Sequence, residues 1–159
     1  MNNEVMFSSK SQEWETPQWL FDKYNDIYHF DLDVCASHEN HKCPEYFTKE
    51  QDGLKQSWEG KTCWMNPPYG RGITKWINKA YEEVYNGYCK AVVMLLPGRV
   101  DTKYFHETCV IGEIMFLKGR LKFGGSENPA PFPSMIVLFT MHDDIPSLEM
   151  LKPRIGVPY

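Results

Sequence analysis

A rigid turn that offers two hydrogen-bond acceptors lies near the middle of the chain, at Asn66-Pro67-Pro68-Tyr69. The Asn66 side-chain oxygen and the Pro67 carbonyl can both accept, and Pro68 holds that carbonyl in a fixed direction. Two such acceptors suit one planar amino group, and pulling on both of its hydrogens favours the reactive form in the transition state. Tyr69 can stack on the base that carries this amino group, and such stacking is worth about 1–3 kcal/mol. The turn therefore predicts chemistry at an amino group, and its alternative is a proline-stiffened turn with an asparagine cap.

Three candidate aspartates precede this turn in the sequence. Asp31 and Asp33 belong to the alternating segment 30–34, and Asp52 lies in the polar stretch 37–59. Ligands of open α/β sheets bind beyond the carboxyl ends of the strands, where these carboxylates are expected. Turn capping and solvated loop charge are the alternative roles, and both are common for aspartate.

Segments of helical and strand character alternate along the chain and must position these residues. Helices are predicted over residues 17–28, 73–84 and about 101–109, the first with Thr16 as its cap and Pro17 at its first position. Strands are predicted over residues 30–34, 62–65, 91–96, 113–117 and 134–140. The run 91–96 is apolar throughout, as in a strand buried on both faces. The alternation predicts an α/β three-layer domain with a largely parallel sheet.

The composition limits the class of protein. The 159 residues are close to one domain of about 150 residues, so residues 1–159 are expected to form a single domain with an irregular tail from about 142. There is no apolar run of roughly 18 residues for a membrane span. Five cysteines, an odd number, do not fit a secreted disulfide framework and favour a reducing cytoplasm. The formal net charge is −4, so any contact with nucleic acid must use a local basic patch.

A basic turn is the best candidate for that patch. Lys118, Arg120 and Lys122 alternate around a glycine and precede Phe123. Such residues could hold phosphates beside a flipped nucleotide. Further candidates for the same surface are Arg71, Lys75, Lys79, Arg99 and, as a second stacking ring, Phe132. A solvated hairpin is the alternative for the turn, and core packing is the alternative for Phe132.

Several short blocks resemble, in their order, the phage-type Dam family of DNA N6-adenine methyltransferases. The blocks are Trp14-Glu15-Thr16-Pro17, residues 30–37, 50–54, Trp58, 66–70, Trp76, 95–97, 101–102 and 119–123, within a resemblance from about 12 to 140. The resemblance implies a compact three-layer Rossmann-like fold that uses S-adenosylmethionine (SAM), with a mostly parallel central sheet. It also implies methyl transfer from SAM to N6 of adenine in DNA after base flipping. Asn66, Pro67, Pro68 and Tyr69 would then be the catalytic residues.

The resemblance further implies a set of contacts with SAM. The implied cofactor-binding residues are Thr16, Pro17, Asp33, Cys35, Ala36, Asp52, Gly53 and Leu54. Thr16 would touch the methionine part, and Asp33 would lie in the pocket below the sulfonium. Asp52 would accept from the amino group of the cofactor's adenine. The glycine-rich turn of many SAM-binding domains is absent after the first strand, where residues 37–40 read Ser-His-Glu-Asn.

Other functions share parts of this pattern. The same chemistry could act on cytosine N4, on RNA or on a protein glutamine, and a non-catalytic nucleic-acid-binding module could keep the fold. Cys35, His38, His41 and Cys43 are residue types that bind zinc, but their spacing matches no common finger, so no metal is expected.

The expected partner is DNA, with no membrane association. Little of the chain is spare for sequence recognition, so a second subunit, as in a homodimer, is one way to supply it. The resemblance places the protein in the cytoplasm of a bacterial host, encoded by a phage or prophage, in the setting of restriction and modification.

Overall fold

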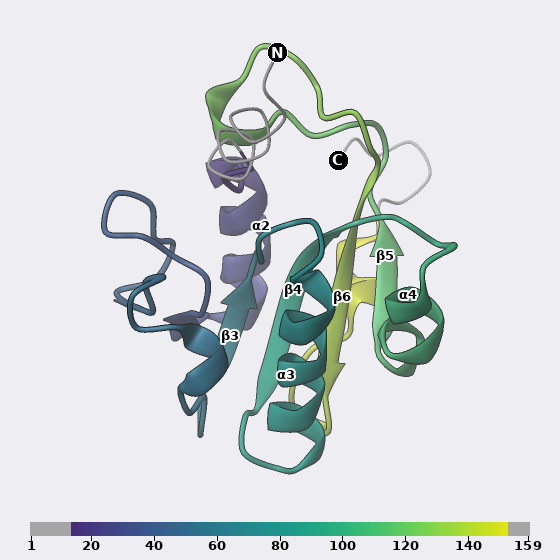
Figure 1. Ribbon diagram of the computed structural model, residues 1–159. Coiled ribbons are helices and arrows are strands. Elements are labelled where there is room, and N and C mark those ends of the chain that lie inside the picture. Colours follow the sequence, from purple (N-terminus) through teal and green to yellow (C-terminus); the bar gives the residue numbers. More distant parts are fainter. Residues whose placement is uncertain (1–13, 153–159) are drawn as a thin grey trace.

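A six-stranded sheet forms the centre of the computed structural model, which describes residues 14–152 (Figure 1). Its strands are β1 Leu32–Asp33, β2 Glu45–Tyr46, β3 Thr62–Met65, β4 Ala91–Pro97, β5 Glu113–Phe116 and β6 Ser134–Thr140. Their order across the sheet is β2-β1-β3-β4-β6-β5. The first four of these are parallel neighbours, whereas β6 is antiparallel to both β4 and β5.

The sheet is therefore mixed, and the prediction of a mostly parallel sheet is corrected for the part that holds β6. The apolar run 134–140 shows that this strand is buried but carries no information on its direction. Parallel neighbours need a crossover, usually a helix, while an antiparallel neighbour does not. The connection from β5 to β6 holds only the 3₁₀ turn η3 Phe123–Gly125, which is compatible with the antiparallel arrangement.

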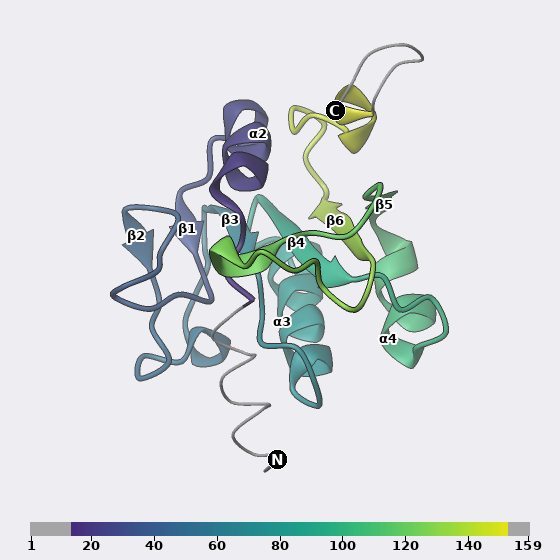
Figure 2. The same cartoon turned by 90° about the horizontal axis from the view of Figure 1, so that it is seen from above.

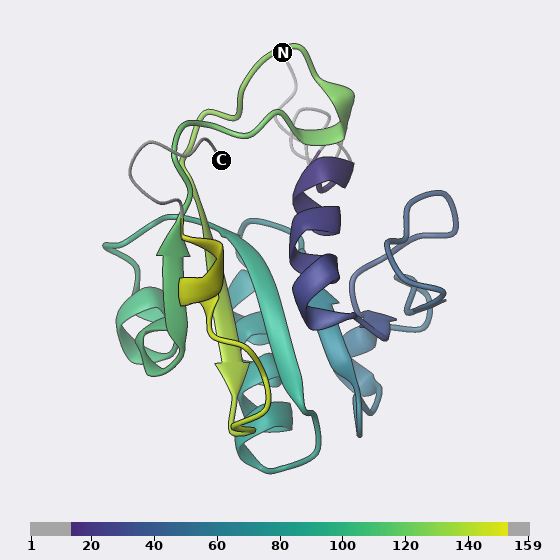
Figure 3. The ribbon, with the colours of Figure 1, turned by 180° about the vertical axis from the view of Figure 1, so that it is seen from behind.

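Helices cover both faces of the sheet, as the fully apolar fourth strand predicts. α2 Gln18–Tyr28 packs on one face, and α3 Ile73–Tyr85 and α4 Lys103–Glu107 lie on the other (Figures 2 and 3). The predicted helices 17–28 and 73–84 are confirmed. The segment 101–109 forms α4, followed by the 3₁₀ turn η2 Cys109–Ile111.

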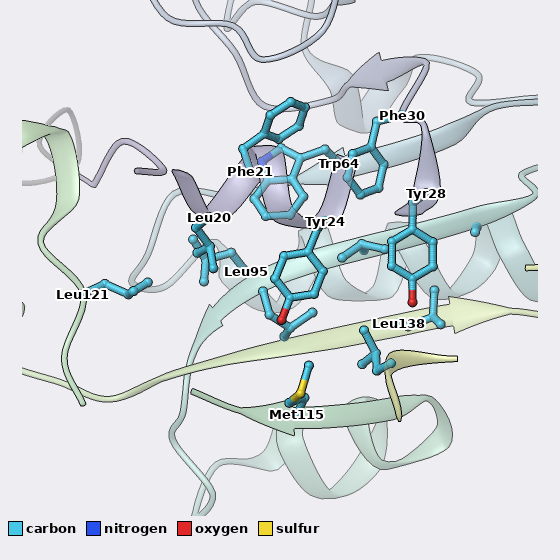
Figure 4. Close-up of a cluster of buried hydrophobic side chains, with 14 of the residues drawn as sticks. Leu20, Phe21, Tyr24, Tyr28, Phe30, Trp64, Leu95, Met115, Leu121 and Leu138 are labelled. Atoms are coloured by element: carbon cyan, nitrogen blue, oxygen red, sulfur yellow. The ribbon is translucent and has the colours of Figure 1, made fainter. Parts of the chain in front are cut away.

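β4 separates two apolar clusters because successive side chains of a strand point to opposite faces. All seven of its residues are buried. Val93 and Leu95 join α2 in the cluster that also contains Trp64 (Figure 4), and Met94 joins α3 in the other cluster. The centre of the sheet is thus packed on both faces, and loops follow at the ends of its strands.

The start of α2 differs from the prediction. Pro17 occupies the capping position, its carbonyl accepts from the Leu20 and Phe21 amides, and no side chain caps the helix. The expectation that Thr16 caps this helix is therefore wrong, and its hydroxyl is available for another contact.

The polar stretch 37–59 is more ordered than its composition suggests. It contains β2, at the edge of the sheet, and the 3₁₀ turn η1 Gly53–Lys55. An edge strand of two residues is too short to show apolar alternation, so no pattern in the sequence predicts it. The first predicted strand, 30–34, is reduced to β1.

The predicted irregular tail forms hydrogen bonds with α2 and with β5. Tyr28 donates to the Pro146 carbonyl at 2.8 Å, and Ser147 and the Leu148 amide bond Glu113 next to η4 Leu148–Leu151. Residues 153–159 of the tail lie outside the described residues. Within residues 14–152, no helix has the length and apolar character needed to span a membrane.

Ile77 tests the packing of α3 on the sheet. Its side chain is fully buried, so Ile77→Ala should lower the free energy of unfolding by about 2–5 kcal/mol, measured by urea denaturation. Asn78→Ala, on the exposed side of the same helix, is the control and should change it by less than about 0.5 kcal/mol. Equal effects of the two variants would contradict the packing described here.

Candidate active site

Most of the predicted site residues gather at the carboxyl ends of the parallel strands. Asp33 ends β1, Asn66 follows β3, and Pro97 ends β4. The connection between β5 and β6 passes over this edge towards the N-terminal end of α2 (Figures 1 and 2). The structure therefore brings the Asn66 turn, the segment before α2 and the basic turn into one region.

The Asn66 carboxamide is held by the segment that precedes α2. Its Nδ2 donates to the Trp14 carbonyl at 2.7 Å and to Thr16 Oγ1 at 3.1 Å. A carbonyl has no hydrogen to donate, so the amino group of the amide must face Trp14. The amide oxygen is thereby directed away from both contacts.

The Asn66 oxygen is left without a bond. Oδ1 is buried and has no hydrogen-bond partner among residues 14–152. A buried acceptor without a partner costs about 1–3 kcal/mol, so such groups are rare unless a ligand supplies the donor. This atom is the acceptor that the sequence analysis predicts, and the structure leaves it without a donor among the described residues.

Tyr69 lies in an aromatic cluster with Trp14, Phe123 and Phe132. The Trp14 and Tyr69 rings are stacked with centroids 6.4 Å apart, and Phe132 meets them edge-on at 5.1 and 5.5 Å. The Tyr69 hydroxyl donates to the Leu95 carbonyl at 3.3 Å, and burial raises its pKa, so it stays protonated. This aromatic cluster connects the Asn66 turn with the segment before α2 and with the connection between β5 and β6.

A pocket of about 240 Å³ opens beside Tyr69. Its walls are Tyr69, Gly70, Ile73, Pro97, Arg99, Thr102, Tyr104 and Phe132. Aromatic rings and a single cation are surfaces that suit a base and its phosphate. A second hollow of about 200 Å³, between β5 and η4, contains none of the predicted site residues.

Asp33 organises the loop after β1. Its side chain is 3% exposed and accepts from the Cys35 amide at 3.2 Å and the Lys42 amide at 2.9 Å. Burial raises the pKa of this carboxyl to about 6, although both hydrogen bonds oppose the shift. Two amides bound to one carboxylate close the loop that in many SAM-binding domains is shaped by glycines. Ala36 is fixed nearby, because its amide donates to the Phe47 carbonyl.

The turn at Asp52 packs directly against β1's end. Asp52 has a φ of 56°, which is unusual for a residue other than glycine, and its side chain accepts from the Leu54 amide at 3.1 Å. Gly53 is required because a Cβ there would overlap the Val34 carbonyl oxygen and touch Trp76. The structure thus places Asp52, Gly53 and Leu54 next to the loop that Asp33 holds.

The predicted basic surface is partly formed. Arg71, Lys118, Arg120 and Lys122 are exposed, as are Lys75 and Arg99. Lys79 is not available to this surface, because it pairs with Glu83 at 2.6 Å and lies over the Trp58 ring. Phe123, expected to face nucleic acid, is 1% exposed and packs edge-on against Trp14.

Tyr46 lies between the two histidines of residues 35–43 and contacts both of them. The His41 ring stacks on Tyr46 at 3.9 Å, His38 contacts the Tyr46 hydroxyl at 2.9 Å, and Cys43 is buried in the core. Over the described range 14–152, no three His, Cys, Asp or Glu side chains come together in a way that could hold a metal ion.

Comparison with known proteins identifies the family. Residues 5–148 match the family described as DNA N-6-adenine-methyltransferase (Dam). The chain belongs to the Dam family. The DNA N-6-adenine-methyltransferase of Haemophilus phage HP1 (strain HP1c1) is 36% identical over 137 residues, which are 79% of this chain and 77% of that protein. The protein of the same description from Escherichia phage T1 is 34% identical over 96 residues, 59% of this chain and 39% of that protein. The resemblance to the phage-type Dam family is thus confirmed.

Some residues of this Dam-family site had no clear signal in the sequence. Trp14 stands out in the sequence only as part of a block, yet its carbonyl accepts from Asn66 and its ring stacks on Tyr69. Tyr104 lines the pocket beside Tyr69, although it belongs to a short helix about 35 residues along the chain, and Thr102, the cap of that helix, stands out in the sequence only as part of a block. Their role comes from proximity in space, which helical periodicity cannot reveal.

The raised pKa of Asp33 predicts a pH dependence of stability. The unfolded carboxyl loses its proton near pH 3.8, whereas the folded protein keeps it until about pH 6. Between these values the folded state binds more protons, so the contribution of Asp33 to the free energy of unfolding falls as the pH rises. Urea unfolding of wild type and Asp33→Asn should show the wild type losing about 2 kcal/mol relative to the variant between pH 4 and 7. A difference that is constant with pH would disprove the shift.

Proposed function

We propose that this Dam-family chain transfers the methyl group of SAM to the N6 amino group of adenine in DNA, and that Asn66 and the Pro67 carbonyl hold that amino group. Family membership supports the reaction, and both phage relatives are described as DNA N-6-adenine-methyltransferases. The observation that carries the mechanism is the buried Asn66 oxygen, which has no partner within the described part of the chain.

Asn66 and Pro67 would act on the amino group before and during transfer. Each accepts one of its two hydrogens, which draws the nitrogen away from the plane of the base and makes its lone pair available. Pro68 keeps the Pro67 carbonyl in place because its ring restricts the backbone. Asn66 needs no movement to accept, since its Nδ2 is already bound to Trp14 and Thr16.

The donor set around β1 and β3 fits SAM. The cofactor carries a cationic amino group, a sulfonium and ribose hydroxyls, and carboxylates such as Asp33 and Asp52 suit these groups. Asp52 also has a backbone conformation of the kind that is often retained at binding sites. The other residues that would complete the site are Thr16, Pro17, Cys35, Ala36, Gly53 and Leu54. When bound, SAM supplies an electrophilic methyl group that the adenine nitrogen can attack without a covalent enzyme intermediate.

The sheet supports the same assignment. We infer that it is a Rossmann-like methyltransferase sheet in which four neighbouring parallel strands present the cofactor loops. Its ligand site would lie beyond the carboxyl ends of these strands, as in other open α/β sheets.

The adenine must leave the duplex, because its amino group is paired and stacked there. Tyr69 and Phe132 both line the pocket described above, and their rings meet at 76°. Tyr69 would therefore stack on the extruded base and Phe132 would contact its edge, with Arg99 near its phosphate. Arg71, Lys118, Arg120 and Lys122 would hold the flanking backbone, while Phe123 supports Trp14 from the protein side. DNA and SAM meet in the cytoplasm of a bacterial host, which is where we infer that the protein acts. A second subunit remains our proposal for extending DNA recognition.

Asn66→Ala tests the assignment of the acceptor. Loss of a group that stabilises the transition state should lower the rate of methyl transfer by about 10²–10³-fold, with SAM affinity largely retained. The rate is measured with labelled SAM and duplex DNA, and SAM affinity by calorimetry. Asn78→Ala, far along α3, is the control. Digestion of the product to nucleosides should yield N6-methyladenine; N4-methylcytosine would favour the other base. Near-normal turnover by Asn66→Ala would refute the mechanism.

Asp52→Asn tests the cofactor assignment without disturbing the turn. Asparagine tolerates positive φ and can still accept from the Leu54 amide, but it replaces a carboxylate oxygen with an amino group. Loss of a charge-assisted hydrogen bond should weaken SAM binding by about 10–100-fold. Calorimetry is the measurement, and Asp22→Asn, exposed on α2, is the control. Unchanged SAM affinity in Asp52→Asn would exclude this role for the carboxylate.

A further inference from the structure

We propose that Thr16 is a positioning residue for Asn66: its hydroxyl, together with the Trp14 carbonyl, holds the Asn66 carboxamide in the orientation in which Oδ1 and not Nδ2 faces the amino group to be methylated. This inference rests on the proposed function, because it explains how the group on which that function depends is oriented. It is separate from the cofactor contact that the resemblance implies for Thr16.

The two hydrogens of the Asn66 amino group have defined partners. One is directed at the Trp14 carbonyl at 2.7 Å, and the other at Thr16 Oγ1 at 3.1 Å. Rotation of the amide by 180° would place Oδ1 against the Trp14 carbonyl, which has no hydrogen to donate, and would turn the amino group towards the substrate. The Trp14 carbonyl thus excludes the flipped amide, and the Thr16 hydroxyl adds the second bond that holds the observed one. An amino group there would repel the hydrogens of the substrate amine, so the reaction requires the observed orientation.

Thr16 is itself held in place. It is buried, and the following Pro17 restricts its backbone. On one side the Pro17 carbonyl accepts from the Leu20 and Phe21 amides at the start of α2, and on the other the Glu15 carbonyl accepts from the Gly124 amide at 3.0 Å. The hydroxyl of a rigidly held residue gives Asn66 a fixed reference.

The Thr16 hydroxyl has no local role at the helix start. A threonine before a helix commonly caps it with its side chain, but α2 is not capped by a side chain. The hydroxyl instead accepts from a residue 50 positions away in the sequence. Of the two acceptors, Thr16 is also the one that a substitution can remove, because Trp14 contributes its backbone carbonyl.

Thr16→Val and Thr16→Ser form the test. Valine keeps the shape and removes the acceptor, whereas serine keeps the hydroxyl. At saturating SAM and DNA, Thr16→Val should lower the single-turnover rate by about 10–100-fold, and Thr16→Ser should stay close to wild type. In an Asn66→Ala background, Thr16→Val should cause no further loss, because both changes remove the same interaction.

Several results would overturn the proposal. They are a wild-type rate for Thr16→Val, an equal loss in both variants, or weaker SAM binding with an unchanged rate at saturation, which would make Thr16 a cofactor contact only. Failure of the proposed function would look different, since Asn66→Ala would then itself be active. Hydrogen exchange of the Asn66 side-chain amide in the wild type gives a test that needs no Thr16 variant. Protected hydrogens agree with the two bonds, and exchange at the rate of an exposed amide contradicts them.

Discussion

The pair of hydrogen bonds from Asn66 to the segment before α2 is the constraint on which the site depends. It joins a turn that follows β3 to residues about 50 positions earlier in the sequence. Both hydrogens of the amide are used by these bonds. The amide oxygen, which can only accept, is buried and has no partner among the described residues. The protein bears the cost of an unpaired acceptor in the absence of substrate. In the proposed mechanism the substrate amino group would supply the missing donor, which would make the site selective for a donor.

The aromatic cluster extends this constraint to the rest of the edge. Trp14 contributes its carbonyl to Asn66 and its ring to Tyr69, Phe123 and Phe132. Three segments that are distant in sequence are therefore packed as one unit. The connection between β5 and β6, which contains the basic residues, also packs against this cluster, because Phe123 and Gly124 contact the segment before α2. Residues expected to hold DNA and residues expected to act on the base are thereby mechanically connected.

The proposed cofactor side has carboxylates at positions where many SAM-binding domains have glycines. Asp33 closes the loop after β1 through two amide bonds and remains nearly fully buried. Asp52 adopts a left-handed backbone and caps its own turn, and Gly53 lets that turn approach Val34 closely. Both aspartates thus cap backbone amides of their own loops, which is a common role of aspartate. A carboxylate that shapes a loop can still offer its remaining lone pairs to a ligand, so structural and binding roles coexist in one residue.

The sequence by itself determined the α/β class, the two long helices, the buried central strand and the turn at Asn66-Pro67-Pro68-Tyr69. These features depend on periodicity and on proline geometry, which are local. Only the tertiary structure decided the direction of β6, the existence of the edge strand β2 and the burial of Phe123. It also decided that the Thr16 hydroxyl binds Asn66 and does not cap α2. Each of these depends on which distant segments lie side by side, and a polar or aromatic residue type does not specify its partner.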